Sequence, residues 1–217
     1  MTRYRFRFAI TGLLRFLSHL DLMRTIERAM RRANLPLALT QGFHPRPKLN
    51  FASALAVGIS SSDEYFDVEL TAPMEPEEIK ERLNAVLPGD LKILACREVS
   101  LQARPLMAIV DTAAYVMTPG EEDALARVPE LLEARTLPIQ RTTKRGTNEV
   151  DVRPLLLDLQ VQDGQLKLLA RTGSKGNLRP EELLRLLGTD HRVWQIHRQG
   201  LYVTRDGQLK SPMDVDR

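Results

Sequence analysis

Apolar and charged side chains alternate over the first ten residues of the chain. Tyr4, Phe6 and Phe8 share one face of an extended segment, and the intervening arginines occupy the other face. A period of two is typical of a β-strand that is buried on one side. The pattern therefore predicts a half-buried strand over residues 3–9.

The period becomes helical after Ser18. Asp21 follows Ser18 by three positions, a spacing similar to that of a capping box. We expect a helix from residue 19 to about residue 33, ended by Asn34 and Pro36. Its predicted inward stripe is Leu22, Met23, Ile26, Ala29, Met30 and Ala33, and its predicted outward face carries Arg24, Arg28, Arg31 and Arg32.

Shorter segments complete the first half of the chain. The pattern predicts strands over residues 52–59, 65–70 and 91–99, and a helix over residues 76–87 with acidic residues in its first turn. The predicted order is β-α-β-β-α-β, the ferredoxin-like split-βαβ pattern. In that fold, two helices cover one face of an antiparallel sheet.

The pattern then starts again, less regularly. It predicts strands over residues 108–117, 137–142, 152–161, 165–171 and 193–203, and helices over residues 121–134 and 180–187. We therefore expect an α+β protein of two tandem ferredoxin-like halves, the second less regular, on element order alone. The predicted domains are residues 1–103 and 104–207, followed by a polar tail over residues 208–217.

Composition and the N-terminus indicate a cytoplasmic protein. The chain has 217 residues, of which 43% are hydrophobic and 27% charged. No apolar run approaches the roughly 20 residues that a membrane helix requires. The N-terminus alternates arginines with aromatic residues, so it does not have the apolar core of a signal peptide. We expect no contact with a membrane.

The cysteine and histidine content predicts neither a metal nor a cofactor. Cys96 is the only cysteine, which excludes an internal disulfide and a cysteine-based metal site supplied by this chain alone. It lies in an apolar run, where a thiol is more often buried and inert than reactive. The His-Glu-x-x-His spacing of many zinc sites is absent.

Charge is distributed unevenly along the chain. Residues 1–50 contain ten Lys and Arg against two Asp and Glu, whereas residues 51–100 contain four against ten. A basic surface on one part of the first half suits a partner that carries phosphates. The alternative is that both sets of charges are simply solvated.

The segment from Thr40 to Phe51, which we call the recognition loop, has the most unusual composition. It holds two prolines, a glycine, two aromatic residues, a histidine and two cations. Proline fixes φ and cannot donate a backbone hydrogen bond, so Pro45 and Pro47 favour a stiff, extended loop. The predicted binding residues are Gln41, Phe43, His44, Arg46 and Lys48 of the loop and Arg24, Arg28 and Arg31 of the preceding helix.

This combination suits RNA. Arginine and lysine neutralise phosphates, aromatic rings stack on unpaired bases, and a stiff loop loses little entropy on binding. The alternative is that Phe43 and Phe51 fill the core and that the prolines only shape a long connection.

His19 and His44 allow a catalytic hypothesis. Paired imidazoles can act as general base and general acid on a ribose 2′-hydroxyl. His19, however, comes one residue after a helix cap, where a surface histidine is common, and nothing in the sequence places it beside His44. A non-catalytic role is therefore favoured over a nuclease.

Two later segments are also basic and contain glycine. Residues 141–153 include Lys144, Arg145 and Arg153, and we expect a flexible loop that becomes ordered on a partner. Residues 171–177 include Lys175 and could form an anion pocket before a helix. For both segments, a plain solvated loop is an equal alternative.

Several segments resemble a known family. They are Arg15-Phe-Leu-Ser-His-Leu-Asp-Leu-Met-Arg24, Gln41-Gly-Phe-His-Pro-Arg-Pro-Lys48, Phe51-Ala-Ser-Ala-Leu-Ala-Val-Gly58 and Asn-Glu-Val-Asp-Val-Arg153. The chain resembles the radical-SAM-linked family of bacterial proteins, encoded beside or fused to a radical SAM protein with a cobalamin-type domain. The resemblance implies a radical SAM protein as partner.

The chain lacks the sequence motifs of radical SAM chemistry and cobalamin binding. It contains neither a Cys-x-x-x-Cys-x-x-Cys triad nor the Asp-x-His-x-x-Gly motif of cobalamin binding. More loosely, the paired ferredoxin-like order is similar to that of RAMP-type RNA-processing proteins, although their late glycine-rich loop is not evident after Gly188.

Together these observations favour a non-catalytic RNA-binding or substrate-presenting accessory protein that acts with a separate radical SAM enzyme, for example in RNA modification. One alternative is a protein-interaction adaptor that docks on that enzyme. The other is a metal-independent endoribonuclease of the RAMP type that uses His44 and His19.

Overall fold

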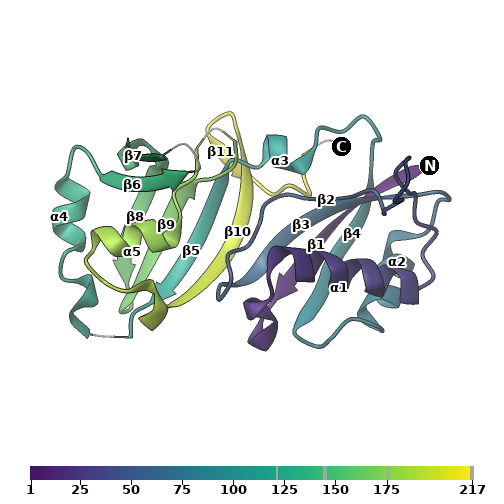
Figure 1. Cartoon of the computed structure of the whole chain (residues 1–217), viewed down its shortest axis with the longest axis horizontal. Coiled ribbons are helices and arrows are strands. Elements are labelled where there is room, and N and C mark those ends of the chain that lie inside the picture. The colour runs from purple at the N-terminus through teal and green to yellow at the C-terminus, as the bar shows by residue number, and fades with distance from the viewer. Residues whose placement is uncertain (121, 144–145, 175, 216–217) are drawn as a thin grey trace. The chain divides into compact units, whose positions relative to one another are not determined.

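The strands form a large, mostly antiparallel sheet, and the helices are few and short (Figure 1). The computed structural model describes residues 1–120, 122–143, 146–174 and 176–215. The chain divides into two compact units, Met1–Val110 with Gly200–Arg217 and Asp111–Gln199. The sequence had placed the division after residue 103 and the last strand in the second half. Its boundaries therefore differ from those of the structure.

The first unit has the predicted element order. It contains β1 (Thr2–Ile10), the 3₁₀ helix η1 (Gly12–Phe16), α1 (His19–Arg32), β2 (Leu49–Phe51), β3 (Ser60–Leu70), α2 (Pro76–Asn84), β4 (Leu91–Val99) and α3 (Leu106–Ile109). β1 lies between β4 and β3, β2 pairs with β3, and all these pairs are antiparallel. The unit is completed by the end of β10 (Gln195–Arg205) and by β11 (Gln208–Lys210), which pairs with it.

Aromatic rings from three strands form the core of the first unit. Phe6 stacks on Phe66 with ring centroids 4.6 Å apart, and the ring of Phe51 lies 5.5 Å from that of Phe66 and 6.0 Å from that of Phe8. Helix α1 packs its apolar stripe into the same unit, and the buried members are Leu22, Ile26, Ala29 and Met30. The alternation in β1 thus predicted the buried face of the sheet correctly.

The cap of α1 is also as predicted. Ser18 Oγ accepts a hydrogen bond from the Asp21 backbone N–H at 3.2 Å and donates one to the Asp21 carboxylate at 2.7 Å. Arg31 and Arg32 lie in the last turn, where cations interact favourably with the negative end of the helix dipole. These local rules are sufficient to fix where α1 begins and which face it presents to solvent.

The predicted strand over residues 52–59 is wrong. Only Leu49–Phe51 form a strand there, and the chain then turns before β3 begins at Ser60. Gly58 has a φ of +91°, a left-handed conformation that interrupts an extended chain. Its N–H donates to the Arg15 carbonyl at 2.8 Å, so this turn is tied to η1.

The second unit does not repeat the first. It contains β5 (Thr112–Thr118), η2 (Glu122–Leu125), α4 (Val128–Glu133), β6 (Pro138–Thr143), β7 (Gly146–Asp151), η3 (Arg153–Leu155), β8 (Leu156–Gln162), β9 (Gln165–Arg171), α5 (Pro180–Leu186), η4 (His191–Val193) and the start of β10. β9 lies between β5 and β8, whereas β6 and β7 form a separate hairpin. Two tandem ferredoxin-like halves are therefore not confirmed.

The segment predicted to be a polar tail is packed against the first unit. Pro212 and Val215 are buried, and their carbonyls accept hydrogen bonds from Arg5 Nη1 at 2.8 Å and Arg97 Nη2 at 2.6 Å. Tyr65 Oη also lies 3.2 Å from Ser211 Oγ. The buried guanidinium of Arg5 and the half-buried one of Arg97 thus hold this segment in place.

Arg5 differs from the predicted pattern because the C-terminal segment covers it. Alternation placed it on the side of β1 away from the core, yet its side chain is 0% exposed. It donates two hydrogen bonds to Asp67, from Nε at 2.9 Å and from Nη2 at 3.1 Å, in addition to the one to Pro212. Because the guanidinium is paired with Asp67 and each of its three nitrogens donates a hydrogen bond, its charge can be buried.

Candidate nucleic-acid interface

The recognition loop is a narrow excursion closed by backbone hydrogen bonds. Leu39 and Pro47 form an isolated bridge, and the Thr40 N–H donates to the Arg46 carbonyl at 2.8 Å. The Arg46 N–H donates in turn to Thr40 Oγ1 at 3.1 Å. The residues between them, Gln41 to Arg46, are all exposed. The loop therefore presents its tip to solvent from a closed base.

The two phenylalanines of the loop have opposite environments. Phe43 is fully exposed, at 103% of its reference area, whereas Phe51 is only 7% exposed and belongs to the core. Stacking on a base is thus open to Phe43 alone, and the core-filling alternative applies to Phe51. Gln41, His44 and Arg46 are exposed with Phe43, so the predicted polar and aromatic groups of the tip lie together.

Lys48 lies at the base of the loop and contributes to an ion-pair network. Its Nζ lies 2.9 Å from Glu69 Oε2, and Arg3 Nη2 lies 3.0 Å from Glu69 Oε1. The hydrogen bond from Lys48, followed by that from Arg3, lowers the pKa of Glu69 below its usual value. The network joins the loop to β1 and β3, and Lys48 is less free to bind a ligand than the sequence suggested.

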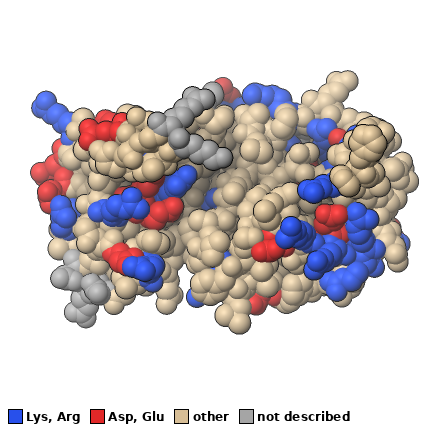
Figure 2. Space-filling view, viewed as in Figure 1, with Lys and Arg blue, Asp and Glu red and all other residues tan. Residues whose placement is uncertain are grey.

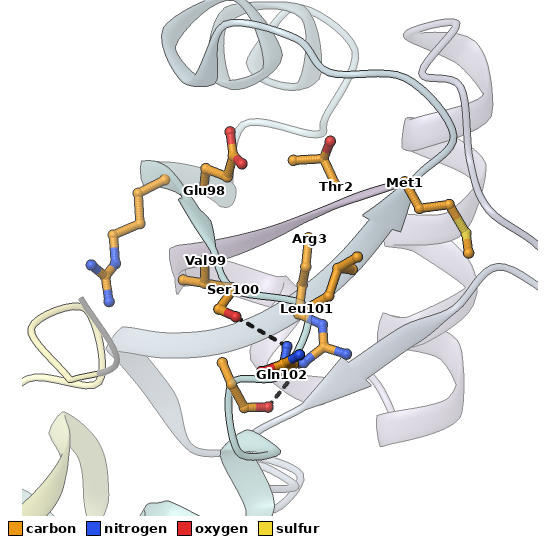
Figure 3. Close-up of a pocket in the computed structure, with 10 residues that line it drawn as sticks. Met1, Thr2, Arg3, Glu98, Val99, Ser100, Leu101 and Gln102 are labelled. Carbon is orange, nitrogen blue, oxygen red and sulfur yellow. Dashed lines mark hydrogen bonds between the residues drawn. The ribbon is translucent and has the colours of Figure 1, made fainter.

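A pocket of about 810 Å³ lies beside this network (Figure 3). It is lined by residues 1–3 at the start of β1 and residues 97–103 at the end of β4 and in the turn beyond it. Arg3 Nη1 donates to the Ala103 carbonyl at 3.0 Å, and the Gln102 N–H donates to Ser100 Oγ at 3.1 Å. Arg3 therefore lines the pocket and is connected, through Glu69, to Lys48 at the base of the recognition loop.

The lining of this pocket is mixed. Val99 and Leu101 supply apolar surface, while Arg97, Glu98 and Gln102 supply both donors and acceptors. Such a volume lies in the range of small-molecule sites. The sequence did not indicate this pocket, because its two sides come from segments about a hundred residues apart.

The two histidines considered for catalysis are not brought together by any described contact. His19 lies edge-on to Phe51, with ring centroids 5.3 Å apart, and its buried Nδ1 has no hydrogen-bond partner among the described residues. His44 is exposed at the loop tip. His19 contacts Phe51, which pairs with Phe66 of β3. The residues before Phe51 pair progressively further along β3, toward Leu70, so the loop tip with His44 lies on the side away from His19.

The predicted arginines of α1 are exposed and lie along one face of the helix. Arg24 Nη1 lies 3.3 Å from Asp21 Oδ1, and Arg31 Nη2 lies 3.0 Å from Glu27 Oε1. The hydrogen bond from Ser18, followed by that from Arg24, lowers the pKa of Asp21. Figure 2 shows Lys and Arg gathered over the region of α1. No described contact joins these arginines to the recognition loop.

The predicted sites of the second unit receive less support. Arg153 is half-buried, and its Nε donates to the Ala134 carbonyl at 3.1 Å, which is a structural contact. Lys144, Arg145 and Lys175 lie outside the described residues. Arg141, which had not been singled out, donates to both carboxylate oxygens of Glu182 at 2.8 Å and so links β6 to α5.

An exposed apolar cluster around η1 was missed by the sequence. Leu13, Phe16, Leu20 and Val57 are all largely exposed. The turn at Gly58 holds this region together through its bond to Arg15, whose guanidinium lies 4.8 Å above the ring of Phe16. One sequence feature could have indicated this cluster, because Leu20 is apolar and lies outside the inward stripe predicted for the helix. Clustered exposed apolar side chains are typical of surfaces that bind other proteins.

The predictions for Cys96, metal ligands and membrane helices can also be compared with the structure. Burial, and secondarily the nearby Glu77, raises the pKa of the Cys96 thiol, which keeps it protonated. In the part of the chain that the structure describes, no three His, Cys, Asp or Glu side chains are grouped as metal ligands. Within the same residues, no helix has the length and apolar character to cross a membrane.

The fold and these surfaces define an α+β protein with an exposed aromatic and basic loop. The chain belongs to the family described as "Uncharacterized protein conserved in bacteria (DUF2344)", whose family model matches residues 3–180. A search of curated proteins gave no match. One similar solved structure is the "Crystal Structure of an Unknown Protein from Galdieria sulphuraria", with 14% identity over 91% of this chain and 97% of that one, and a TM-score of 0.29.

Proposed function

We propose that this protein is a non-catalytic RNA-binding accessory protein that presents RNA to a separate radical SAM enzyme. The observation that carries the proposal is the recognition-loop tip, where Phe43 is fully exposed beside His44 and Arg46 on a closed, proline-containing base. Single-stranded RNA is bound through such aromatic surfaces together with cations that follow its backbone. The resemblance in residues 15–58 supports the radical SAM enzyme as partner.

The pocket beside Arg3 extends this proposal. Arg3 contacts Glu69, which also pairs with Lys48 of the loop, so the pocket and the loop share one structural support. A base that leaves the stack on Phe43 would find polar edges and apolar walls in the pocket. We therefore propose that Phe43 at the loop tip stacks on one base and that the pocket beside Arg3 accommodates a nucleotide.

RNA binding is tested by titrating a fluorescein-labelled oligouridylate into the protein at increasing salt. We expect saturable binding that weakens with salt, and a salt dependence about 0.7 shallower in log–log slope for Arg46→Gln if that side chain contacts one phosphate. Arg205→Gln, which removes another exposed arginine of the first unit, is the matched control. No binding at low salt, or equal slopes for the two variants, would reject the proposal.

A second candidate function is that of a protein-interaction adaptor, favoured by the apolar cluster around η1. The side chains of Leu13 and Phe16 are 79% and 54% exposed, so both present apolar area to solvent. In this case the cluster would dock on the radical SAM enzyme, and RNA binding would be secondary. The two functions use different surfaces and can be separated by mutation.

The adaptor function predicts the behaviour of a Leu13→Ser, Phe16→Ser variant. On co-expression with the proposed radical SAM partner, the variant should lose co-purification because the apolar contact area is removed, while oligouridylate binding stays unchanged. Met107→Ser, at another exposed apolar side chain of the first unit, should co-purify normally. Retained co-purification of the double variant would argue against docking through this cluster.

A further inference from the structure

A basic groove separate from the recognition loop lies between α1 and the turn that follows α2. It is lined by Thr25, Arg28, Arg31 and Arg32 of α1 and by residues 86–88, and its volume is about 630 Å³. Three guanidinium groups line it, and no carboxylate does. All of these residues belong to the first unit.

The groove has a fixed edge and accessible cations. Arg32 Nη2 donates to the Val86 carbonyl at 2.5 Å, which ties the end of α1 to the opposite wall. Arg31 uses one nitrogen for Glu27, and its guanidinium has further N–H donors available. Arg28 is exposed, and the carboxylate whose pKa it helps to lower, that of Asp21, lies about two turns nearer the helix start. The cations on this face are thus only partly neutralised.

The chemistry of the groove favours one kind of ligand. Arginine forms bidentate hydrogen bonds with phosphate oxygens, and the opposite wall, formed by Val86, Leu87 and Pro88, offers apolar surface rather than side-chain acceptors. Arg28 to Arg32 extends over about 6 Å of helix, so the three guanidinium groups can contact more than one phosphate. Apart from its arginines, the lining has Thr25 as its one polar side chain, so it has few groups that could distinguish one base from another.

We propose that this groove binds the phosphodiester backbone of single-stranded RNA, independently of base sequence. This inference rests on the proposed function and deepens it. The recognition loop contacts bases through Phe43, whereas the α1 groove neutralises phosphates through Arg28 and Arg31. The RNA is then held at two places on the first unit, by stacking at one and by charge at the other.

The test uses Arg28→Glu, Arg31→Glu in the full chain. The matched control is Arg127→Glu, Arg185→Glu, which reverses two exposed arginines of the second unit. Far-UV circular dichroism and melting temperature confirm that both variants fold. Labelled oligouridylate and oligoadenylate are titrated at several salt concentrations, and inorganic polyphosphate serves as a probe that has no bases.

We expect the groove variant to lose at least about tenfold in affinity for both RNAs, with a log–log salt dependence shallower by about 1.4 for two lost phosphate contacts. Polyphosphate binding should be lost in this variant and unchanged in Phe43→Ala. If the groove variant binds RNA as tightly as the control while Phe43→Ala binds RNA more weakly, phosphate binding by the groove is rejected and RNA binding by the recognition loop is retained. If wild-type protein does not bind RNA, both the proposed function and the groove are rejected.

Discussion

Replacing Arg5 with alanine is expected to lower the free energy of unfolding by about 3–5 kcal/mol, the usual cost of removing one partner of a buried ion pair. The substitution would leave the carboxylate of Asp67, whose side chain is 6% exposed, without the bidentate partner that it has at 2.9 and 3.1 Å. It would also remove the donor to the Pro212 carbonyl. The C-terminal segment should therefore loosen together with the sheet.

Urea unfolding followed by far-UV circular dichroism measures this change. Arg24→Ala is the control, because its pair with Asp21 is solvent-exposed and such pairs contribute about 0–1 kcal/mol. Hydrogen exchange of β11 should increase in Arg5→Ala and not in Arg24→Ala. A loss below 1 kcal/mol in Arg5→Ala would contradict the role given to this pair.

Replacing Phe51 with alanine is expected to cost about 3–5 kcal/mol of stability, as is typical of a large aromatic residue removed from a core. Its ring contacts the rings of Phe8, His19 and Phe66, so a cavity would open between α1 and the sheet. Phe43→Ala removes the same side chain from the same loop at a fully exposed position, and it should change stability by less than about 0.5 kcal/mol.

Thermal and urea unfolding of these two variants provide a matched comparison within one loop. Equal stability losses would mean that Phe43 also packs against the protein, which would remove the reason for treating it as a recognition residue. A near-neutral Phe51→Ala would contradict the aromatic core described for the first unit.

Local patterns were sufficient for part of this fold. The alternation of Tyr4, Phe6 and Phe8 predicted the core face of β1, and Ser18 with Asp21 predicted the start of α1, because both depend on residues close in sequence. The covering of Arg5 was not predictable in this way. It depends on Asp67 and Pro212, which lie 62 and 207 positions away.

The same distinction applies to the candidate site. The composition of the recognition loop predicted an exposed, stiff tip, and residues 41–46 are exposed. The pairing of Lys48 with Glu69, the pocket beside Arg3 and the groove beside Arg28 all require segments that meet only in the folded chain. The exposure of Phe43 and the burial of Phe51 likewise depend on the register of β2 on β3, which composition does not specify.

The most direct test of the central claim is the affinity of Phe43 variants for single-stranded oligouridylate, measured by fluorescence anisotropy at low salt. Stacking on one base contributes about 1–3 kcal/mol, so Phe43→Ala should bind about 5- to 150-fold more weakly than the wild type. Phe43→Trp, which keeps an aromatic face, should bind as tightly as the wild type. Equal affinity of the wild type, Phe43→Ala and Phe43→Trp would contradict RNA recognition by this loop.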